Sequence, residues 1–211
     1  MPDARLRAFI AVPVPSTLHR PIARVIDALR KQPGGDRVRW VRAENLHVTL
    51  RFLGKIDPDI IPTLLERVGE RTAQHEAFEL TLAHVQLFPS QRRPSVVAFE
   101  LAPAEPLTRL AEAVEQGVVA AGLPGESRPF RSHLTLGRIR ERHSALDVTA
   151  SDTALSDSLP VTEAILFQSE LRKSGAFHTP LAQVWAAASA PSAVLASPLH
   201  SSKPKEQNTD G

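Results

Sequence analysis

The stretch Leu46-His47-Val48-Thr49-Leu50 decides the fold, because the chain repeats it closely at Ser132-His133-Leu134-Thr135-Leu136. In an extended strand, successive side chains point to opposite faces. The histidine and threonine of each copy therefore share one face, and the aliphatic residues share the other. Each copy predicts a strand that is anchored to a core by its apolar side and presents an imidazole and a hydroxyl on its opposite side.

The elements around the two copies follow the same order, and this predicts two similar lobes in one domain over residues 1–189. The first copy is preceded by a strand and by a helix whose N-cap is expected at Ser16, and it is expected to end at Gly54. A polar break at residues 91–94 separates the lobes. The predicted strands are 7–14, 38–41, 46–53, 78–87, 96–101, the second motif, and a closing hairpin of 161–171 and 177–185; the predicted helices follow Ser16 and Asp57 and span 106–121.

Composition narrows the class of protein. The 211 residues are 42% hydrophobic, which is enough for a buried core, and the chain has no cysteine. Disulfides, cysteine-ligated zinc and thiol catalysis are thereby excluded. Pro13 and Pro15 interrupt the N-terminal apolar run, and no run approaches the roughly 20 residues of a membrane span. We expect a cytoplasmic monomer that does not enter a membrane, with a disordered tail over residues 190–211.

Positive charge collects around both motifs. Residues 37–51 carry four arginines and one glutamate, and residues 128–142 carry five arginines and one glutamate. Because the net charge of the chain is only +2, the remainder is net negative. Such a distribution favours an anionic ligand near the histidines, although solvated surface arginines are the plain alternative.

Two imidazoles on facing strands match the chemistry of a cyclic phosphodiester. Hydrolysis needs a base that deprotonates water on one side of phosphorus and an acid that protonates the departing oxygen on the other. Histidine titrates near pH 6.5 and serves either role. His47 and His133 are the candidate pair, Thr49 and Thr135 the candidate donors to the nonbridging oxygens, and a nearby arginine offsets the developing charge.

Several stretches together resemble the bacterial and archaeal RNA 2′,3′-cyclic phosphodiesterases of the 2H phosphoesterase superfamily, also known as 2′-5′ RNA ligases. The resemblance implies an α+β, bilobal, pseudo-two-fold fold, with two antiparallel sheets flanking a central cleft and helices outside. It implies metal-free and cofactor-free opening of a 2′,3′-cyclic phosphate to a 2′-phosphate, with His47 as proton donor and His133 as proton acceptor. The stretches are Phe9-Ile10-Ala11-Val12, Arg39-Trp40-Val41, residues 45–54 and residues 129–138.

The family pattern also includes an arginine five residues after the second histidine, here Arg138. Strict alternation would turn Arg138 away from His133, so we expect a bulge or strand end at Gly137. Arg131 has the parity to point inward unaided and is the second candidate. Relatives often carry Gly-x-x-Tyr where this chain has Gly175-Ala176-Phe177-His178, and the chain has no tyrosine.

Alternatives accompany this prediction. A noncatalytic binder of RNA ends or nucleotides would not need two titrating groups, and ligation would use the same site in the reverse direction. A zinc site is disfavoured because neither motif brings a third ligand at a suitable spacing. The partner is then an RNA with a cyclic phosphate end or a cyclic nucleotide. Packing is the expected role of Phe9, Trp40, Phe52 and Phe130, with stacking on a base as the alternative for Phe9 and Trp40. The remaining histidines are expected to be ordinary surface or core residues: His19, His75, His84, His143 and His200.

Overall fold

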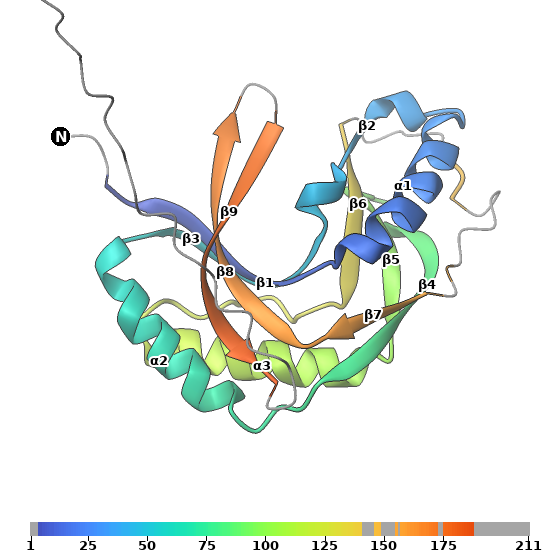
Figure 1. The fold of residues 1–211 in the computed structure, drawn as a ribbon. Coiled ribbons are helices and arrows are strands. Elements are labelled where there is room, and N and C mark those ends of the chain that lie inside the picture. The colour runs from blue at the N-terminus through green and yellow to red at the C-terminus, as the bar shows by residue number, and fades with distance from the viewer. Residues whose placement is uncertain (1–3, 141–145, 149–154, 156, 173–174, 188–211) are drawn as a thin grey trace, which may run out of the picture.

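The computed structural model describes residues 4–140, 146–148, 155, 157–172 and 175–187. The predicted tail, His143 and His200 lie outside the described residues. The described chain is α+β, as predicted, with two antiparallel sheets and three α-helices (Figure 1). Among the described residues, no helix is both long enough and apolar enough to cross a membrane.

The first sheet has the strand order β3-β1-β8-β9, and all neighbours are antiparallel. Its edge strand β3 carries the first motif, and the β8–β9 hairpin forms the opposite edge. The pairing of Arg172 with Gly175 closes this hairpin where the sequence predicts it. The bounds are β1 Leu6–Pro13, β3 His47–Ile56, β8 Glu163–Arg172 and β9 Gly175–Ala186.

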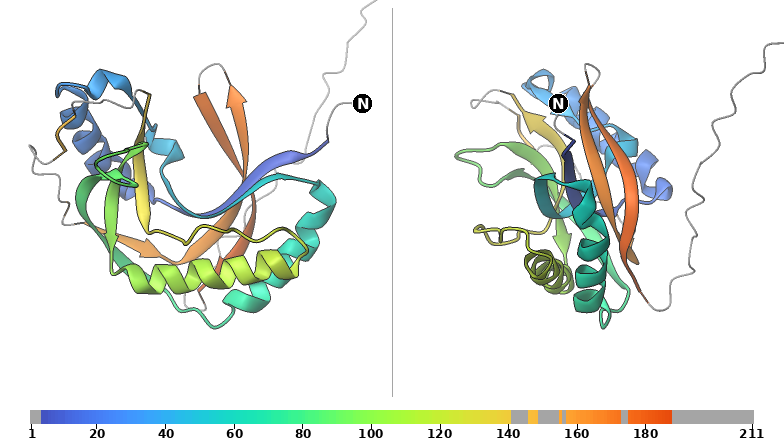
Figure 2. Two further views of the ribbon diagram at one scale, coloured as in Figure 1. Left: turned by 180° about the vertical axis from the view of Figure 1, so that it is seen from behind. Right: turned by 90° about the vertical axis from the view of Figure 1, so that its left-hand side faces the viewer.

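The second sheet has the order β2-β6-β5-β4-β7, again antiparallel throughout. The second motif lies on β6, between β5 and the short strand β2. Figure 2 shows this sheet beside the first, with α2 and α3 below. The bounds are β2 Val38–Trp40, β4 Phe78–Phe88, β5 Val96–Ala102, β6 His133–Ile139 and β7 Ser158–Val161 for the strands, and α1 Ser16–Arg30, α2 Ile61–Thr72 and α3 Ala104–Ala120 for the helices.

The two lobes repeat one unit. In β1–α1–β3 and in β5–α3–β6, the motif strand pairs with the first strand of its own unit. The symmetry ends at the outer edge, because β2 covers β6 whereas β3 remains an edge strand. The repeat predicted from the two motifs is therefore present in the strand order, and β2 is the element that makes the lobes different.

Three predicted element boundaries are wrong. Pro15 takes the N-cap position of α1, so Ser16 is already helical. Strand β3 continues through Gly54, whose φ of 71° accompanies a bulge and does not end the strand. The predicted strand 161–171 is two strands, because the chain leaves the second sheet after Val161 and joins the first at Glu163. Only Thr162 separates β7 from β8, so no loop marks the change of sheet.

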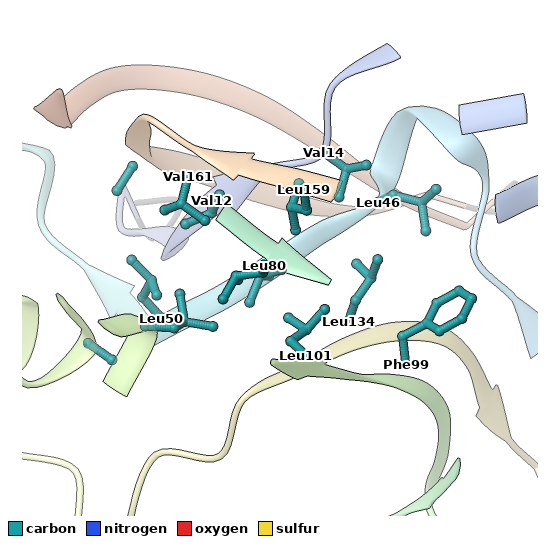
Figure 3. Packing of buried hydrophobic residues seen from close by; sticks show 14 of the residues in the cluster. Val12, Val14, Leu46, Leu50, Leu80, Phe99, Leu101, Leu134, Leu159 and Val161 are labelled. Atoms are coloured by element: carbon teal, nitrogen blue, oxygen red, sulfur yellow. The ribbon is translucent and has the colours of Figure 1, made fainter. Parts of the chain in front are cut away.

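The apolar side of each motif strand is buried, as predicted. Val48, Leu134 and Leu136 are fully buried and Leu50 nearly so. Figure 3 shows Leu50 and Leu134 among side chains from both sheets, including Leu80 of β4. Burying one such side chain stabilises the fold by about 1.5–3 kcal/mol. The core thereby fixes which face of each motif strand remains for the histidines.

Candidate active site

Each motif strand contains a bulge directly after its threonine. On β3, Thr49 pairs with Ala11 and Arg51 with Ile10, so Leu50 has no partner of its own. On β6, Thr135 pairs with Ala98 and Gly137 with Val97, which leaves Leu136 unpaired in the same way. The extra residue shifts the alternation of side chains by one.

The bulges turn the fifth residue after each histidine to the histidine face. On β6 this residue is Arg138, and its positive charge lowers the pKa of both His47 and His133. On β3 it is Phe52, which pairs with Phe9. The bulge predicted near Gly137 is confirmed, and the matching bulge on β3 was not predicted, because no glycine marks it.

Gly137 allows β2 to approach β6 closely. A Cβ atom at this position would lie 2.4 Å from Cγ1 of Val38 and 3.0 Å from Cε3 of Trp40. The indole Nε1 of Trp40 donates a hydrogen bond of 3.0 Å to the carbonyl of Gly35. Trp40 is therefore a packing residue, as expected, and it covers the glycine that precedes Arg138.

The two histidines are held in the same way. Nδ1 of His47 lies 2.7 Å from the carbonyl oxygen of Asn45, and Nδ1 of His133 lies 2.8 Å from that of Arg131. A carbonyl oxygen only accepts, so each Nδ1 carries the hydrogen. Nε2 is consequently the nitrogen available for proton transfer on both rings: it accepts when the imidazole is neutral and donates when it is charged.

Burial is the main cause of the lowered pKa of both histidines. The pKa of His47 falls from 6.5 to about 4, because burial is reinforced by the charges of His178, Arg138 and His133, and the carbonyl of Asn45 only partly opposes them. The pKa of His133 is lowered by burial and by Arg131 and Arg138. The charge effects connect His47 with His133 and with Arg138 across the two sheets. In the protein without a ligand, His47 is a neutral imidazole at neutral pH.

A third histidine lies beside the first motif. The ring of His178 on β9 is perpendicular to that of His47, with 5.3 Å between centroids, and lies 4.9 Å from the ring of Phe9. Its Nδ1 is buried and has no hydrogen-bond partner in the described part of the chain. Burial and then the charge of Arg138 lower its pKa. His178 thus occupies the site next to the group expected to donate a proton.

Asn45 connects the first motif to the β8–β9 hairpin. Its carbonyl accepts from His47, and its side-chain Nδ2 donates a hydrogen bond of 3.0 Å to the carbonyl of Ala176, two residues before His178. Both imidazoles of this lobe are therefore positioned through one asparagine. Sequence reasoning did not identify Asn45, although it belongs to the stretch that carries the resemblance.

Around the second motif, an aromatic residue from a distant strand supports the imidazole. The ring of Phe88 stacks on that of His133 at 4.2 Å and an interplanar angle of 16°. The guanidinium of Arg131 lies 4.4 Å from the centroid of Phe88 and donates a hydrogen bond of 3.1 Å to the carbonyl of Pro89. Arg131 is thus already bound to the loop after β4. Phe88 had no signal in the sequence, because it lies far from His133 along the chain.

The two threonines have equivalent surroundings. Thr49 lies opposite Ala11 and Thr135 opposite Ala98, and both alanines are fully buried. A methyl side chain on the neighbouring strand takes little space on the shared face. Both threonines are only half-buried, and they lie two residues from a histidine on the same face.

A match to a protein-family model shows the family of this chain. The model described as LigT like Phosphoesterase matches residues 12–98 and 100–178, which include both motifs and His178. The chain belongs to the LigT-like phosphoesterase family. Within this family of phosphoesterases, the arrangement around His47 and His133 is the candidate active site. In the described residues of this LigT-like chain, no three histidines or acidic side chains group as metal ligands.

Curated relatives and solved structures agree with this family. An RNA 2′,3′-cyclic phosphodiesterase of Bacillus subtilis is 33% identical over 138 residues, which is 65% of this chain and 74% of that protein. One of Thermus thermophilus is 32% identical over 183 residues, covering 83% and 88%. The crystal structure of E. coli LigT complexed with 3′-AMP superposes with a TM-score of 0.70 at 28% identity, covering 87% of this chain and 99% of that one.

Proposed function

We propose that this protein hydrolyses 2′,3′-cyclic phosphate ends of RNA, or cyclic nucleotides, to 2′-phosphates by acid–base catalysis from His47 and His133. The observation that carries the proposal is the equivalent fixation of the two imidazoles, which leaves Nε2 of each ring available on the face that also carries Arg138. The relatives named above, which are RNA 2′,3′-cyclic phosphodiesterases, support the choice of substrate.

In the proposed reaction, Nε2 of neutral His133 accepts a proton from water as the water oxygen attacks phosphorus. The bond between phosphorus and O3′ breaks, and Nε2 of His47 donates a proton to O3′. The product carries a 3′-hydroxyl and a 2′-phosphate. One proton is taken from water and one is given to the sugar, so the enzyme returns to its starting state after a proton passes back to His47.

His47 must take up a proton when the substrate binds, because the lowered pKa leaves this imidazole neutral in the unliganded protein. A phosphate anion close to Nε2 favours the charged form and raises the pKa. His133 needs no such change, since its lowered pKa already favours the neutral base. His47 therefore acts as donor only while the anionic substrate is bound.

Arg138, Thr49 and Thr135 are the proposed ligands of the nonbridging oxygens. Arg138 offsets the charge that develops on phosphorus-bound oxygens, and the two hydroxyls donate from either lobe. Arg131 is the weaker candidate for this role, because its guanidinium is bound to Phe88 and Pro89. The cytoplasmic location, the monomeric state and the absence of a cofactor stay predictions.

Product analysis tests the proposal. We expect the purified protein in EDTA to open nucleoside 2′,3′-cyclic phosphates and cyclic-ended RNA, and chromatography to show the 2′-phosphate product. His19→Gln is the control, because His19 lies on α1 and bonds the carbonyl of Val14. Binding without turnover would support a noncatalytic nucleotide-binding role, and joining of RNA ends would support ligation; either result would contradict the proposed hydrolysis.

A further inference from the structure

Two arginines face each other beside the histidines. Arg39 of β2 lies directly opposite Arg138 of β6 in the antiparallel register. Directly opposed residues share one face of a sheet, and their Cβ atoms are about 4.5–5.5 Å apart. Because Arg138 is on the histidine face, Arg39 is on it too. Opposed like charges destabilise a strand pair, so this arrangement favours a bound anion.

No carboxylate forms an ion pair with Arg39 or Arg138 within the described part of the chain. Exposed arginines elsewhere do have such partners, for example Arg109 with Glu105 on α3 and Arg172 with Glu170 on β8. Among the described residues, the pair opposite each other on β2 and β6 therefore has no carboxylate that compensates its positive charge.

The side chain of Arg39 extends toward the other sheet. Its Nη2 lies 2.9 Å from the position that a Cβ of Gly175 would occupy, at the start of β9. Gly175 has a φ of 129°, which favours glycine, and any side chain there would meet the guanidinium. Figure 1 shows the β8–β9 hairpin projecting on the same side of the molecule as β2 and β6. Arg39 thus reaches from the second lobe to the hairpin of the first.

Arg39 and Arg138 do not act at the same place. The charge of Arg138 lowers the pKa of His47, His133 and His178. The guanidinium of Arg39 lies instead beside Gly175, three residues before His178 on β9, which is a separation of about 10 Å along an extended strand. An anion at Arg39 is a different anion from the phosphate that reacts between His47 and His133.

We propose that Arg39 binds the phosphodiester linkage that precedes the terminal nucleotide, so that the site holds an RNA strand and not only its cyclic end. The proposal rests on the proposed function for the identity of the substrate. Arginine binds a phosphate through two donors in a fixed geometry, and such contacts position a strand without reading its sequence. Arg138 is left for the reacting phosphate.

The test compares two dinucleotides that end in a 2′,3′-cyclic phosphate. One has an ordinary charged linkage, and the other has an uncharged methylphosphonate linkage. We expect wild-type kcat/KM to be about tenfold higher for the charged dinucleotide, because a hydrogen bond to a charged group has about this effect. Arg39→Gln should bring the ratio close to one. Arg109→Gln removes an equal charge from α3 and should keep the wild-type ratio.

Two other results would overturn the role of Arg39, and a third would contradict the proposed function instead. A wild-type ratio that persists in Arg39→Gln overturns the proposal, and so does an equal loss for both dinucleotides, which would place Arg39 at the reacting phosphate. If the wild-type protein hydrolyses neither compound, the proposed function fails separately. The ratio of dissociation constants for the two dinucleotides ending in a 2′-phosphate, measured by calorimetry, then decides the role of Arg39.

Discussion

The two motif strands have the same irregularity, a bulge after the threonine, and differ in the two side chains that follow it. On β3 the bulge is followed by Arg51 and Phe52, and on β6 by Gly137 and Arg138. Arg51 points away from the histidine face and forms an ion pair with Glu115 of α3. Gly137 has no side chain, because β2 packs against it. One repeated scaffold therefore holds two imidazoles symmetrically while the fifth position supplies an aromatic ring in one lobe and a cation in the other.

The largest expected effect comes from removing either imidazole. We expect His47→Ala and His133→Ala each to lower kcat by about 10²-fold or more, because each removes one partner of the proton transfer. The pH dependence should separate the two strands. Loss of the base removes the rise in kcat with increasing pH, and loss of the acid removes the fall in kcat at higher pH, because kcat reports the pKa values of the complex with bound substrate. His133→Ala should therefore lose the acidic limb and His47→Ala the alkaline limb.

Rates of the two variants from about pH 4 to about pH 9, a range that spans the titration of histidine, check this assignment. Opposite losses, with His47→Ala missing the acidic limb, would reverse the roles of the two strands. Loss of the same limb in both variants would contradict the acid–base pair itself. His19→Gln should retain both limbs.

The next largest effect on the kinetics is expected at the fifth residue after each histidine, which is Arg138 on β6 and Phe52 on β3. We expect Arg138→Ala to lower kcat by roughly 10²-fold, since it removes a charge that stabilises the transition state. Arg138→Lys should recover part of the rate, because it restores a charge without the planar geometry. Phe52 was expected to be structural, yet 53% of it is exposed, so Phe52→Ala removes a surface ring but no charge. This variant should instead raise KM for adenosine 2′,3′-cyclic phosphate and change kcat little. Steady-state kinetics of the three variants compare the two strands directly.

A rise in KM for Arg138→Ala with kcat unchanged would show that Arg138 only binds substrate. Arg131→Ala is the matched control, because Arg131 lies beside His133 but is bound to Phe88 and Pro89. If Arg131→Ala has the larger effect on kcat, the two arginines exchange roles.

The repeat could be predicted from the sequence because the alternation of side chains along a strand depends only on neighbouring residues. Alternation alone places His47 with Thr49 and buries Val48, and the same holds for the second copy. The glycine at position 137 also indicated a bulge. Its counterpart on β3 has Leu50 and Arg51 at the irregular position, which are ordinary strand residues, so local pattern gave no sign that Phe52 would face the site.

Contacts between distant segments were beyond the reach of local patterns. Phe88 stacks on His133, and His178 lies against His47, only because the sheets bring separate strands together. The facing of Arg39 and Arg138 depends on the register between β2 and β6, which a strand of three residues does not reveal. The resemblance marked position 178 as unusual, and the structure places it in the site.

The fourth residue after His133, which is Gly137, is predicted to affect the stability of the folded protein. Gly137→Ala should lower the free energy of unfolding by about 1–3 kcal/mol, because the new Cβ would lie 2.4 Å from Val38 and 3.0 Å from Trp40. Gly69→Ala is the control: it lies in α2, nothing lies within 4 Å of its Cβ position, and alanine should stabilise that helix slightly. Urea denaturation of both variants measures the difference, and equal stabilities would contradict the close packing of β2 on β6.

The smallest effect concerns the stability of the protein at low pH. In the folded protein the pKa of His47 is about 4, and in the unfolded chain it is near 6.5. Between these values the unfolded state binds more protons, so stability is fully present above about pH 6.5 and is lost as the pH falls toward about 4. His47→Asn removes this titration and should reduce the loss of unfolding free energy between about pH 7.5 and about pH 4.5 by roughly 1–2 kcal/mol, allowing for the partial exposure of the side chain. His133→Asn should act in the same direction, because burial lowers that pKa as well.

Denaturation of the wild type, both variants and His19→Gln at the two pH values measures these differences in unfolding free energy. A wild-type pH dependence in His47→Asn would mean that burial does not hold this imidazole neutral. Binding of the substrate would then not be needed to change its charge.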